Sequence, residues 1–285
     1  MSTFVPPARV TAPPRLTERY PWLFPVAVLV HRARRRLTWT FSRTSYAHDR
    51  SSEPLPHRVR RHRSLLLRQL GDLGGTEMDL QHGKVTNLRL AAARVDGLAI
   101  RPGETFSFNR VVGNCTRRKG YVEGMRLSNG SARPGVGGGI CQLANLLHWM
   151  FLHAPLTVVE RSEHSFDPFP DNGRVLPWGV GCSIVYNYVD LVVRNDTDRT
   201  FSLHVTVGDR YLEGDLRVDA PLPTSYRVEA RDEQFLEHDG RHFRRNEIWR
   251  TSIDKRTGVP LGDELVKRNC ALVMYLPDGV SVAHV

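Results

Sequence analysis

The sequence predicts an α+β fold, in which a few helices, including one central helix opened by a glycine-rich loop, pack on a mainly antiparallel sheet, with a β-rich C-terminal part. Two observations lead to this prediction. Apolar residues recur at helical spacing in the first half of the chain and alternate with polar residues in the second half. Helices and strands also do not alternate along the chain as in βαβ units, which argues against a doubly wound nucleotide-binding fold.

Charge and composition divide the 285 residues into three expected parts. Residues 1–63 form a basic, proline-containing arm with 13 arginines and three acidic residues, so this part carries the whole formal net charge of +10. Residues 64–218 form the expected core, and residues 219–285 form a β-rich extension. We expect no nucleic-acid binding, because the basic arm has few interleaved aromatic residues and no recognisable nucleic-acid module.

The arm contains one short apolar segment, "WLFPVAVLV" at 22–30. It is too short to span a bilayer, which takes about 20 apolar residues. It also makes a poor signal peptide, because most of the charge follows it instead of preceding it. We expect a helix that lies on the core or on a membrane surface, with Arg32, Arg34, Arg35 and Arg36 on its wet side. The predicted location is cytoplasmic, with possible membrane-peripheral contact.

The elements of the first half follow from local signals. Residues 43–63 are polar and indicate a linker or an extended arm, and "SLLLRQLGDLGG" at 64–75 indicates a helix closed by glycine. Residues 84–97 have helical spacing, with Gly97 where a C-terminal cap belongs. A short strand, a Pro-Gly turn and a second strand containing Phe106 and Phe108 follow.

The second half begins with the clearest helix, "CQLANLLHWMFLHA" at 141–154, which Pro155 ends. Residues 156–166 indicate a strand, and residues 182–218 indicate three strands. The remaining residues predict further hairpins. Their turn signals are "HDG" at 238–240 and "RTG" at 256–258.

The stretch "GVGGGICQ" at 135–142 is the most informative part of the sequence. Glycine tolerates positive φ and lets the backbone approach a ligand closely. The N–H groups at a helix start have no partner within the helix and attract anions. A phosphate-binding P-loop would need a lysine after the glycines, which is not present here. We therefore predict an anion-binding loop at Gly137, Gly138, Gly139 and Gln142.

Cys141 opens the central helix, where the helix dipole is expected to lower the pKa of a thiol. This favours a cysteine nucleophile, as in Cys-His transglutaminase-like enzymes or thiol hydrolases. His164 is the predicted base, and Asp190, or with less support Asp167, is the predicted orienting residue. Gln142 or a loop N–H group would complete an oxyanion hole. The alternative is that Cys141 is a small buried apolar residue.

The other thiols and histidines are expected to be structural. Cys115, Cys182 and Cys270 have no neighbouring base in the sequence, and no cysteine pair has CxxC spacing. His148 lies two helical turns from Cys141, about 10 Å away, and is expected to be a packed or half-exposed histidine. His153 lies near the helix C-terminus, which favours a cation. The sequence predicts no metal site and no cofactor.

Four stretches in this order resemble the VanW family of accessory proteins from glycopeptide-resistance clusters. They are "GETFSFNRVVG", "GYVEGMRLSNG", "GVGGGICQLANLLHWMFLHAPLTVVERSEHS" and "VDLVVRNDTDRTFSLHVTV". The strong resemblance covers about residues 84–218. It implies a role near cell-wall metabolism and draws attention to the loop 137–142, but it assigns no catalytic residue. His148 departs from the aromatic residue expected at that position in close relatives.

Three functions are therefore open. The first is cysteine-dependent acyl or amide chemistry on a cell-wall precursor. The second is non-catalytic binding of an anionic cell-wall precursor, of another small anionic ligand or of a protein partner. The third is docking of the basic arm on anionic lipid or on an acidic protein.

Overall fold

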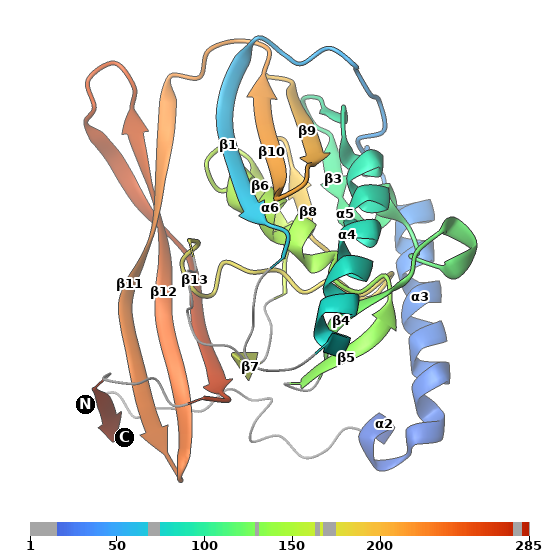
Figure 1. Ribbon diagram of the computed structural model, residues 1–285. Coiled ribbons are helices and arrows are strands. Elements are labelled where there is room, and N and C mark those ends of the chain that lie inside the picture. Colours follow the sequence, from blue (N-terminus) through green and yellow to red (C-terminus); the bar gives the residue numbers. More distant parts are fainter. Residues whose placement is uncertain are drawn as a thin grey trace.

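The computed structural model describes residues 16–67, 75–128, 131–162, 166–167, 175–275 and 281–284. Over these residues the fold is α+β with mainly antiparallel sheets and a strand-rich C-terminal part, which confirms the predicted class (Figure 1).

The core is built on a four-stranded antiparallel sheet in the order β1-β10-β9-β2. Its strands are β1 (His57–Leu65), β10 (Tyr211–Val218), β9 (Phe201–Val207) and β2 (Ala99–Ile100). Strand β1 overturns two expectations. Residues 57–63 are not a linker, because they pair with β10 along its length, and Ser64 and Leu65 end this strand and do not open a helix. Residues 68–74 of that expected helix lie outside the described residues.

Two helices cover this sheet, α4 (Gly75–Val95) and α6 (Cys141–Phe151). The predicted apolar face of α6 is buried, and it lies on β1 and β10. The approach is close at Gly214 of β10, where a Cβ atom would lie 2.6 Å from the side chain of Leu146 and 2.7 Å from that of Met150. A glycine in the strand thus lets the helix sit directly on the sheet. Gly97 follows α4 with φ +74°, as its predicted capping role requires.

Smaller elements surround this core. A three-stranded sheet has the order β3-β8-β6, with β3 (Thr105–Ser107), β8 (Val192–Arg194) and β6 (Thr157–Glu160). Strands β4 (Glu123–Ser128) and β5 (Ser131–Val136) form a separate hairpin beside α4. The short helices are α5 (Phe108–Val112) and η2 (Arg117–Lys119). Phe106 and Phe108 are both buried, but they do not share one strand as expected, because β3 ends at Ser107 and Phe108 begins α5.

The C-terminal part is a long antiparallel ribbon of β11 (Thr224–His238), β12 (Arg241–Asp254) and β13 (Pro260–Val273). Its connections fall at the two predicted turns, and Asp239 and Gly240 both have positive φ at the first of them. Two short strands flank the ribbon in parallel, β14 (Val282–His284) and β7 (Phe166–Asp167).

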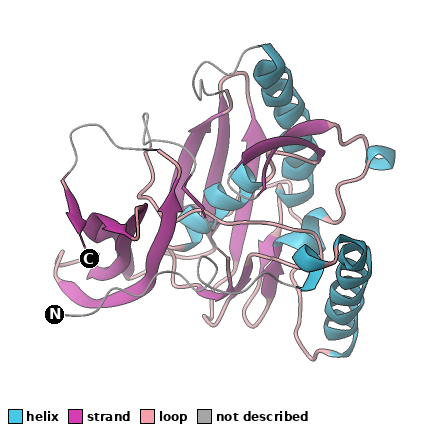
Figure 2. Cartoon of the chain, turned by 90° about the horizontal axis from the view of Figure 1, so that it is seen from below, coloured by secondary structure: helices cyan, strands magenta, loops and turns pink. Residues whose placement is uncertain are grey.

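The described N-terminal residues form α2 (Leu16–Arg19), η1 (Pro21–Leu23) and α3 (Phe24–Phe41). Helix α3 stands at one edge of the molecule and the β11–β13 ribbon at the opposite edge, as two perpendicular views agree (Figures 1 and 2). Among the described helices, none combines the length and apolar character needed to cross a membrane.

Candidate functional site

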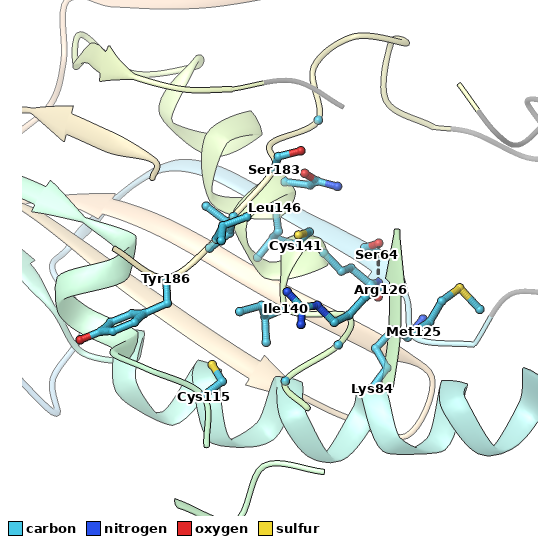
Figure 3. A pocket seen from close by; sticks show the side chains of 18 of the residues that line it. Ser64, Lys84, Cys115, Met125, Arg126, Ile140, Cys141, Leu146, Ser183 and Tyr186 are labelled. Carbon is cyan, nitrogen blue, oxygen red and sulfur yellow. Dashed lines mark hydrogen bonds between the residues drawn. The ribbon is translucent and has the colours of Figure 1, made fainter. Parts of the chain in front are cut away.

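A cavity of about 1080 Å³ opens at the start of α6 (Figure 3). Its walls come from the glycine-rich loop, β1, α4, β4, α3 and the segment 183–186. The predicted residues Gly137, Gly138, Gly139, Cys141 and Gln142 all line it. The structure therefore brings the whole predicted loop together with residues from several distant parts of the chain.

The first two glycines of the loop are required by packing. Gly138 lies so close to β4 that a Cβ atom would be 2.1 Å from the carbonyl oxygen of Gly124. Gly137 has φ +76°, and its Cβ would lie 2.5 Å from the Cβ of Cys115. The N–H of Gly137 donates to the carbonyl of Val122 (3.0 Å), and the N–H of Gly138 donates to the carbonyl of Gly135 (2.9 Å). These two N–H groups are thus already hydrogen-bonded within the protein. They are not available to an anion, so the predicted anion site does not include them.

A buried side chain fixes the loop against β4. Asn87 of α4 is fully buried, and its Nδ2 donates to the carbonyl oxygens of Gly138 (2.9 Å) and Val122 (3.0 Å). The N–H of Val122 donates to Asn87 Oδ1 at 2.9 Å. Removing this amide would leave buried backbone groups unpaired, which is costly. The sequence shows only a polar residue on a helix, so its role emerges from the fold.

The N–H groups of Gly139 and Ile140 remain open. Within the described chain neither donates to a backbone or side-chain acceptor, whereas the N–H groups of Gln142 and Leu143 donate to the carbonyl groups of Gly139 and Ile140. Gly139 has φ +91°, which only glycine adopts without strain. Two open N–H groups at the positive end of α6 form the part of the loop that can receive an anion.

Cys141 is half-buried at the mouth of the helix. Burial raises the pKa of its thiol above the usual value, while a hydrogen bond from the Ile184 N–H and the charge of Arg126 act in the opposite direction. The expectation that the helix dipole gives a lowered pKa is therefore wrong for this environment, because desolvation of the thiolate outweighs it. No described carboxylate or imidazole is hydrogen-bonded to the thiol.

Gln142 faces β1. Its Nε2 donates to Ser64 Oγ at 2.9 Å and to the Leu65 carbonyl at 2.7 Å. The side chain thus ties the first turn of α6 to the end of β1. Its predicted contribution to an oxyanion hole would require breaking these two bonds.

The charge of the cavity is strongly one-sided. Four cationic side chains line it: Arg32, Arg63, Lys84 and Arg126. None of the described lining residues is Asp or Glu. Figure 3 shows Arg126 reaching from β4 toward Cys141. Sequence reasoning missed all four residues as a set, because they come from α3, β1, α4 and β4, and no local spacing relates them.

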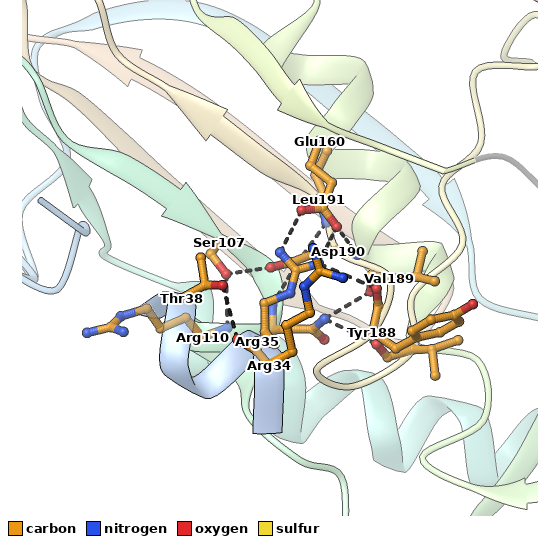
Figure 4. A network of polar contacts seen from close by, with 12 residues as sticks. Arg34, Arg35, Thr38, Ser107, Arg110, Glu160, Tyr188, Val189, Asp190 and Leu191 are labelled. Carbon is orange, nitrogen blue, oxygen red and sulfur yellow. Dashed lines mark hydrogen bonds and ion pairs between the residues drawn. The ribbon is translucent and has the colours of Figure 1, made fainter. Parts of the chain in front are cut away.

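Asp190 lies outside the cavity lining, in a polar network (Figure 4). Its carboxylate accepts from Ser107 Oγ at 2.6 Å and from the N–H groups of Asn109 (2.8 Å) and Leu191 (2.9 Å). Burial raises the pKa of Asp190 to about 6. His164, its predicted partner, lies outside the described residues, so the Cys141–His164–Asp190 arrangement stays a prediction. Asp167, the other orienting candidate, pairs with Arg244 in the C-terminal ribbon.

Two described histidines, His148 and His62, differ as candidate bases for the cavity. His148 is buried, its Nδ1 lies 2.8 Å from the Val180 carbonyl, and burial lowers its pKa to about 3, which confirms that it packs inside the protein. His62 of β1 is the one histidine among the described lining residues of the cavity, and burial together with Arg60 lowers its pKa.

Across the described part of the chain, no group of three or more His, Cys, Asp or Glu side chains could hold a metal ion.

The class of the protein follows from this fold, its cavity and the comparisons with known proteins. Residues 83–217 match the family described as VanW like protein. The chain is 33% identical over 273 residues to the Vancomycin B-type resistance protein VanW of Enterococcus faecalis (strain ATCC 700802 / V583), which covers 94% of this chain and 97% of that protein. The chain therefore belongs to the VanW family.

A second relative matches a shorter region of the chain. The chain is 41% identical over 96 residues to the Uncharacterized protein YoaR of Bacillus subtilis (strain 168), covering 33% of this chain and 32% of that protein. No solved structure matches the chain significantly.

Proposed function

We propose that this protein binds an anionic ligand in the cavity at the start of α6, and that the ligand is a cell-wall precursor. The single observation that carries the proposal is the set of four cationic side chains around a cavity whose described lining contains no carboxylate. Such a surface attracts anions and raises their local concentration. The resistance context comes from the relative named as a Vancomycin B-type resistance protein.

The distribution of donors suits an extended ligand. Arg126 and the open N–H groups of Gly139 and Ile140 lie near the helix start, while Arg63 belongs to β1 and Arg32 to α3. A cavity of about 1080 Å³ is slightly larger than the roughly 300–1,000 Å³ typical of small-molecule sites. A ligand with several anionic groups, such as a nucleotide-linked precursor peptide, would meet more than one of these donors.

Calorimetric titration tests the proposal with two probes, inorganic pyrophosphate and a nucleotide-linked muropeptide precursor. We expect binding that weakens with added salt and that falls about tenfold in Arg126→Ala, since a charge-assisted hydrogen bond is lost. Arg118→Ala is the matched control, because Arg118 lies in η2, outside the cavity lining. Absence of binding of both probes, or equal affinity of Arg126→Ala and the parent chain, contradicts the proposal.

Cysteine-dependent acyl chemistry is a second candidate, favoured by the position of Cys141 in the same cavity. A base would take the thiol proton, the thiolate would attack an acyl carbon, and the N–H groups of Gly139 and Ile140 would stabilise the oxyanion. The bond from the acyl carbon to the leaving nitrogen or oxygen would then break, the leaving group would take the proton back from the base, and water or an acceptor amine would release the acyl group from the thioester. Because burial raises the pKa of the thiol, this route needs a base, for which His62 and His164 are the candidates.

Alkylation of Cys141 by iodoacetamide near neutral pH separates the two candidates. An activated nucleophile reacts faster than free cysteine when the precursor is bound, and slows in His62→Ala or His164→Ala. A rate no faster than that of free cysteine under all conditions excludes the second candidate. This result would leave the binding proposal intact.

A further inference from the structure

Helix α3 docks on the core through its polar face. Arg35 forms an ion pair with Glu160, the ring of His31 lies 4.5 Å from that of Tyr188, and Arg32 lies over Tyr186 at 5.6 Å. None of the described side chains of α3 is buried. The expectation that the apolar side of this helix packs inward and all four arginines face water is therefore wrong for Arg32 and Arg35.

The opposite side of α3 is an exposed apolar stripe. Its members recur every three or four residues and thus share one face of the helix. The stripe consists of Val26, Leu29, Val30, Ala33, Leu37 and Phe41. Its five larger side chains are 53–78% exposed. An apolar face of this extent, left exposed by the described residues, marks an interaction surface.

Charge flanks the stripe. At roughly 100° per residue, Arg34 and Arg36 fall on its two sides, and both are exposed. The helix contains no acidic residue. Just before it, the segment α2–η1 adds Leu16, Tyr20 and Trp22 as further exposed apolar side chains. Apolar residues between arginines, with tyrosine and tryptophan at one end, have the composition of helices that lie in a membrane interface.

The same charges argue against a second copy of the chain as the occupant. Two α3 helices packed along their stripes would bring arginines toward arginines, with no carboxylate on either helix to compensate. An anionic lipid surface instead supplies phosphate groups to the arginines and acyl chains to the stripe.

We infer that the α2–α3 segment docks the protein on an anionic membrane surface, with the stripe of α3 inserted at the interface. The inner face of the same helix contributes Arg32 to the cavity. Docking in this way would place the cavity next to the lipid headgroups and leave the β11–β13 ribbon at the far edge of the molecule (Figure 2).

Vesicle flotation of the full chain tests this inference. The vesicles contain phosphatidylcholine alone, or phosphatidylcholine and phosphatidylglycerol in equal parts. We expect binding to the anionic vesicles, reduced about tenfold or more in the double variant Val30→Glu/Leu37→Glu. The matched control is Val259→Glu/Leu261→Glu, which adds the same charge at comparably exposed apolar positions on the ribbon.

A second pair of variants isolates the charge. Arg34→Glu/Arg36→Glu should lose binding to anionic vesicles, whereas Lys255→Glu/Arg256→Glu, in an exposed turn of the ribbon, should retain it. The inference is overturned by failure to float, by equal flotation of the stripe variant and the parent chain, or by equal binding to neutral vesicles. A dimer that dissociates in the stripe variant, measured by sedimentation equilibrium, also overturns it, because the stripe then binds a second copy.

Discussion

The guanidinium of Arg35 and the carboxylate of Glu160 form a two-point ion pair, with Nη1 to Oε2 at 2.7 Å and Nη2 to Oε1 at 2.5 Å (Figure 4). The pair joins α3 to β6, 125 positions apart in the sequence. Paired contacts of this geometry are stronger than single ones. Since none of the described side chains of α3 is buried, this pair and the neighbouring ring contacts contribute much of the attachment of the helix to the core.

Arg35→Ala should therefore loosen α3 without unfolding the core. We expect the free energy of local opening to fall by about 1–2 kcal/mol, the size of a half-buried charged contact. Hydrogen exchange measured by mass spectrometry should show faster exchange in α3 and little change in α6. Arg34→Ala is the control, because its side chain is exposed; equal exchange in both variants would show that the ion pair does not anchor the helix.

Asp190 predicts a pH dependence of stability. Its folded-state pKa of about 6 lies above the ordinary value of 3.8, so the folded chain binds this proton more tightly than the unfolded chain. The stability it contributes is complete below pH 4 and is lost as the pH rises through 6. Between pH 4.5 and pH 7 the parent chain should lose about 2 kcal/mol more than Asp190→Asn, as measured by denaturant unfolding.

Asp196, an exposed carboxyl group, serves as a control, because its contribution to stability changes with pH in the opposite direction. The Arg194 side chain lowers the pKa of Asp196, so any stability from Asp196 is present above its ordinary pKa and is lost as the pH falls. Asp196→Asn should leave the change between pH 4.5 and pH 7 nearly untouched. If Asp190→Asn and Asp196→Asn show the same pH profile, the buried carboxyl is not the titrating group.

Gly138→Ala should be strongly destabilising. The added methyl group would meet the Gly124 carbonyl oxygen at 2.1 Å, and backbone atoms on both sides cannot yield without separating the loop from β4. We expect a loss of about 3 kcal/mol in the free energy of unfolding. Gly262→Ala, where no atom lies within 4 Å, should change it by less than about 0.5 kcal/mol. Similar stability of the two variants would mean that the loop is not held against β4.

Gln142→Ala separates a structural role from a ligand-binding one. The loss of its two hydrogen bonds to Ser64 and Leu65 should cost about 1–2 kcal/mol of stability. The affinity for pyrophosphate should change less than twofold. In the control Gln234→Ala, an exposed contact to Arg245 is lost, and stability should hardly change. A large loss of pyrophosphate affinity in Gln142→Ala would restore the predicted binding role.

The sequence predicted well where one local pattern decides the structure. The apolar spacing after Cys141 predicts α6, although the helix ends at Phe151, three residues before the predicted end at 154. The turns at 238–240 and 256–258 predict the ribbon. It failed for residues 57–65, because a strand that contains four arginines and follows two prolines is as polar as a typical linker. Pairing with β10, with Arg58 and Arg61 facing acidic partners, makes it a strand.

The candidate site likewise has features that the sequence predicts and features that depend on the fold. The glycine-rich loop and Cys141 are contiguous, so their common location was predictable. The raised pKa of Cys141 was not, because it depends on burial of the thiol in the folded chain, which outweighs the lowering effect of the Ile184 N–H. The open N–H groups are those of Gly139 and Ile140 and not those of the first two glycines, and this follows only from the acceptors at Val122 and Gly135.

Strand β1 also decides which fragment of the chain can fold on its own. The family match begins at residue 83, yet β1 occupies His57–Leu65 and covers one side of β10. A fragment limited to residues 83–217 would leave the hydrogen-bonding groups of β10 open, and an open sheet edge templates association between molecules. Such a fragment would also lose the anchor of Gln142. The segment recognised as the family is therefore smaller than the unit that folds.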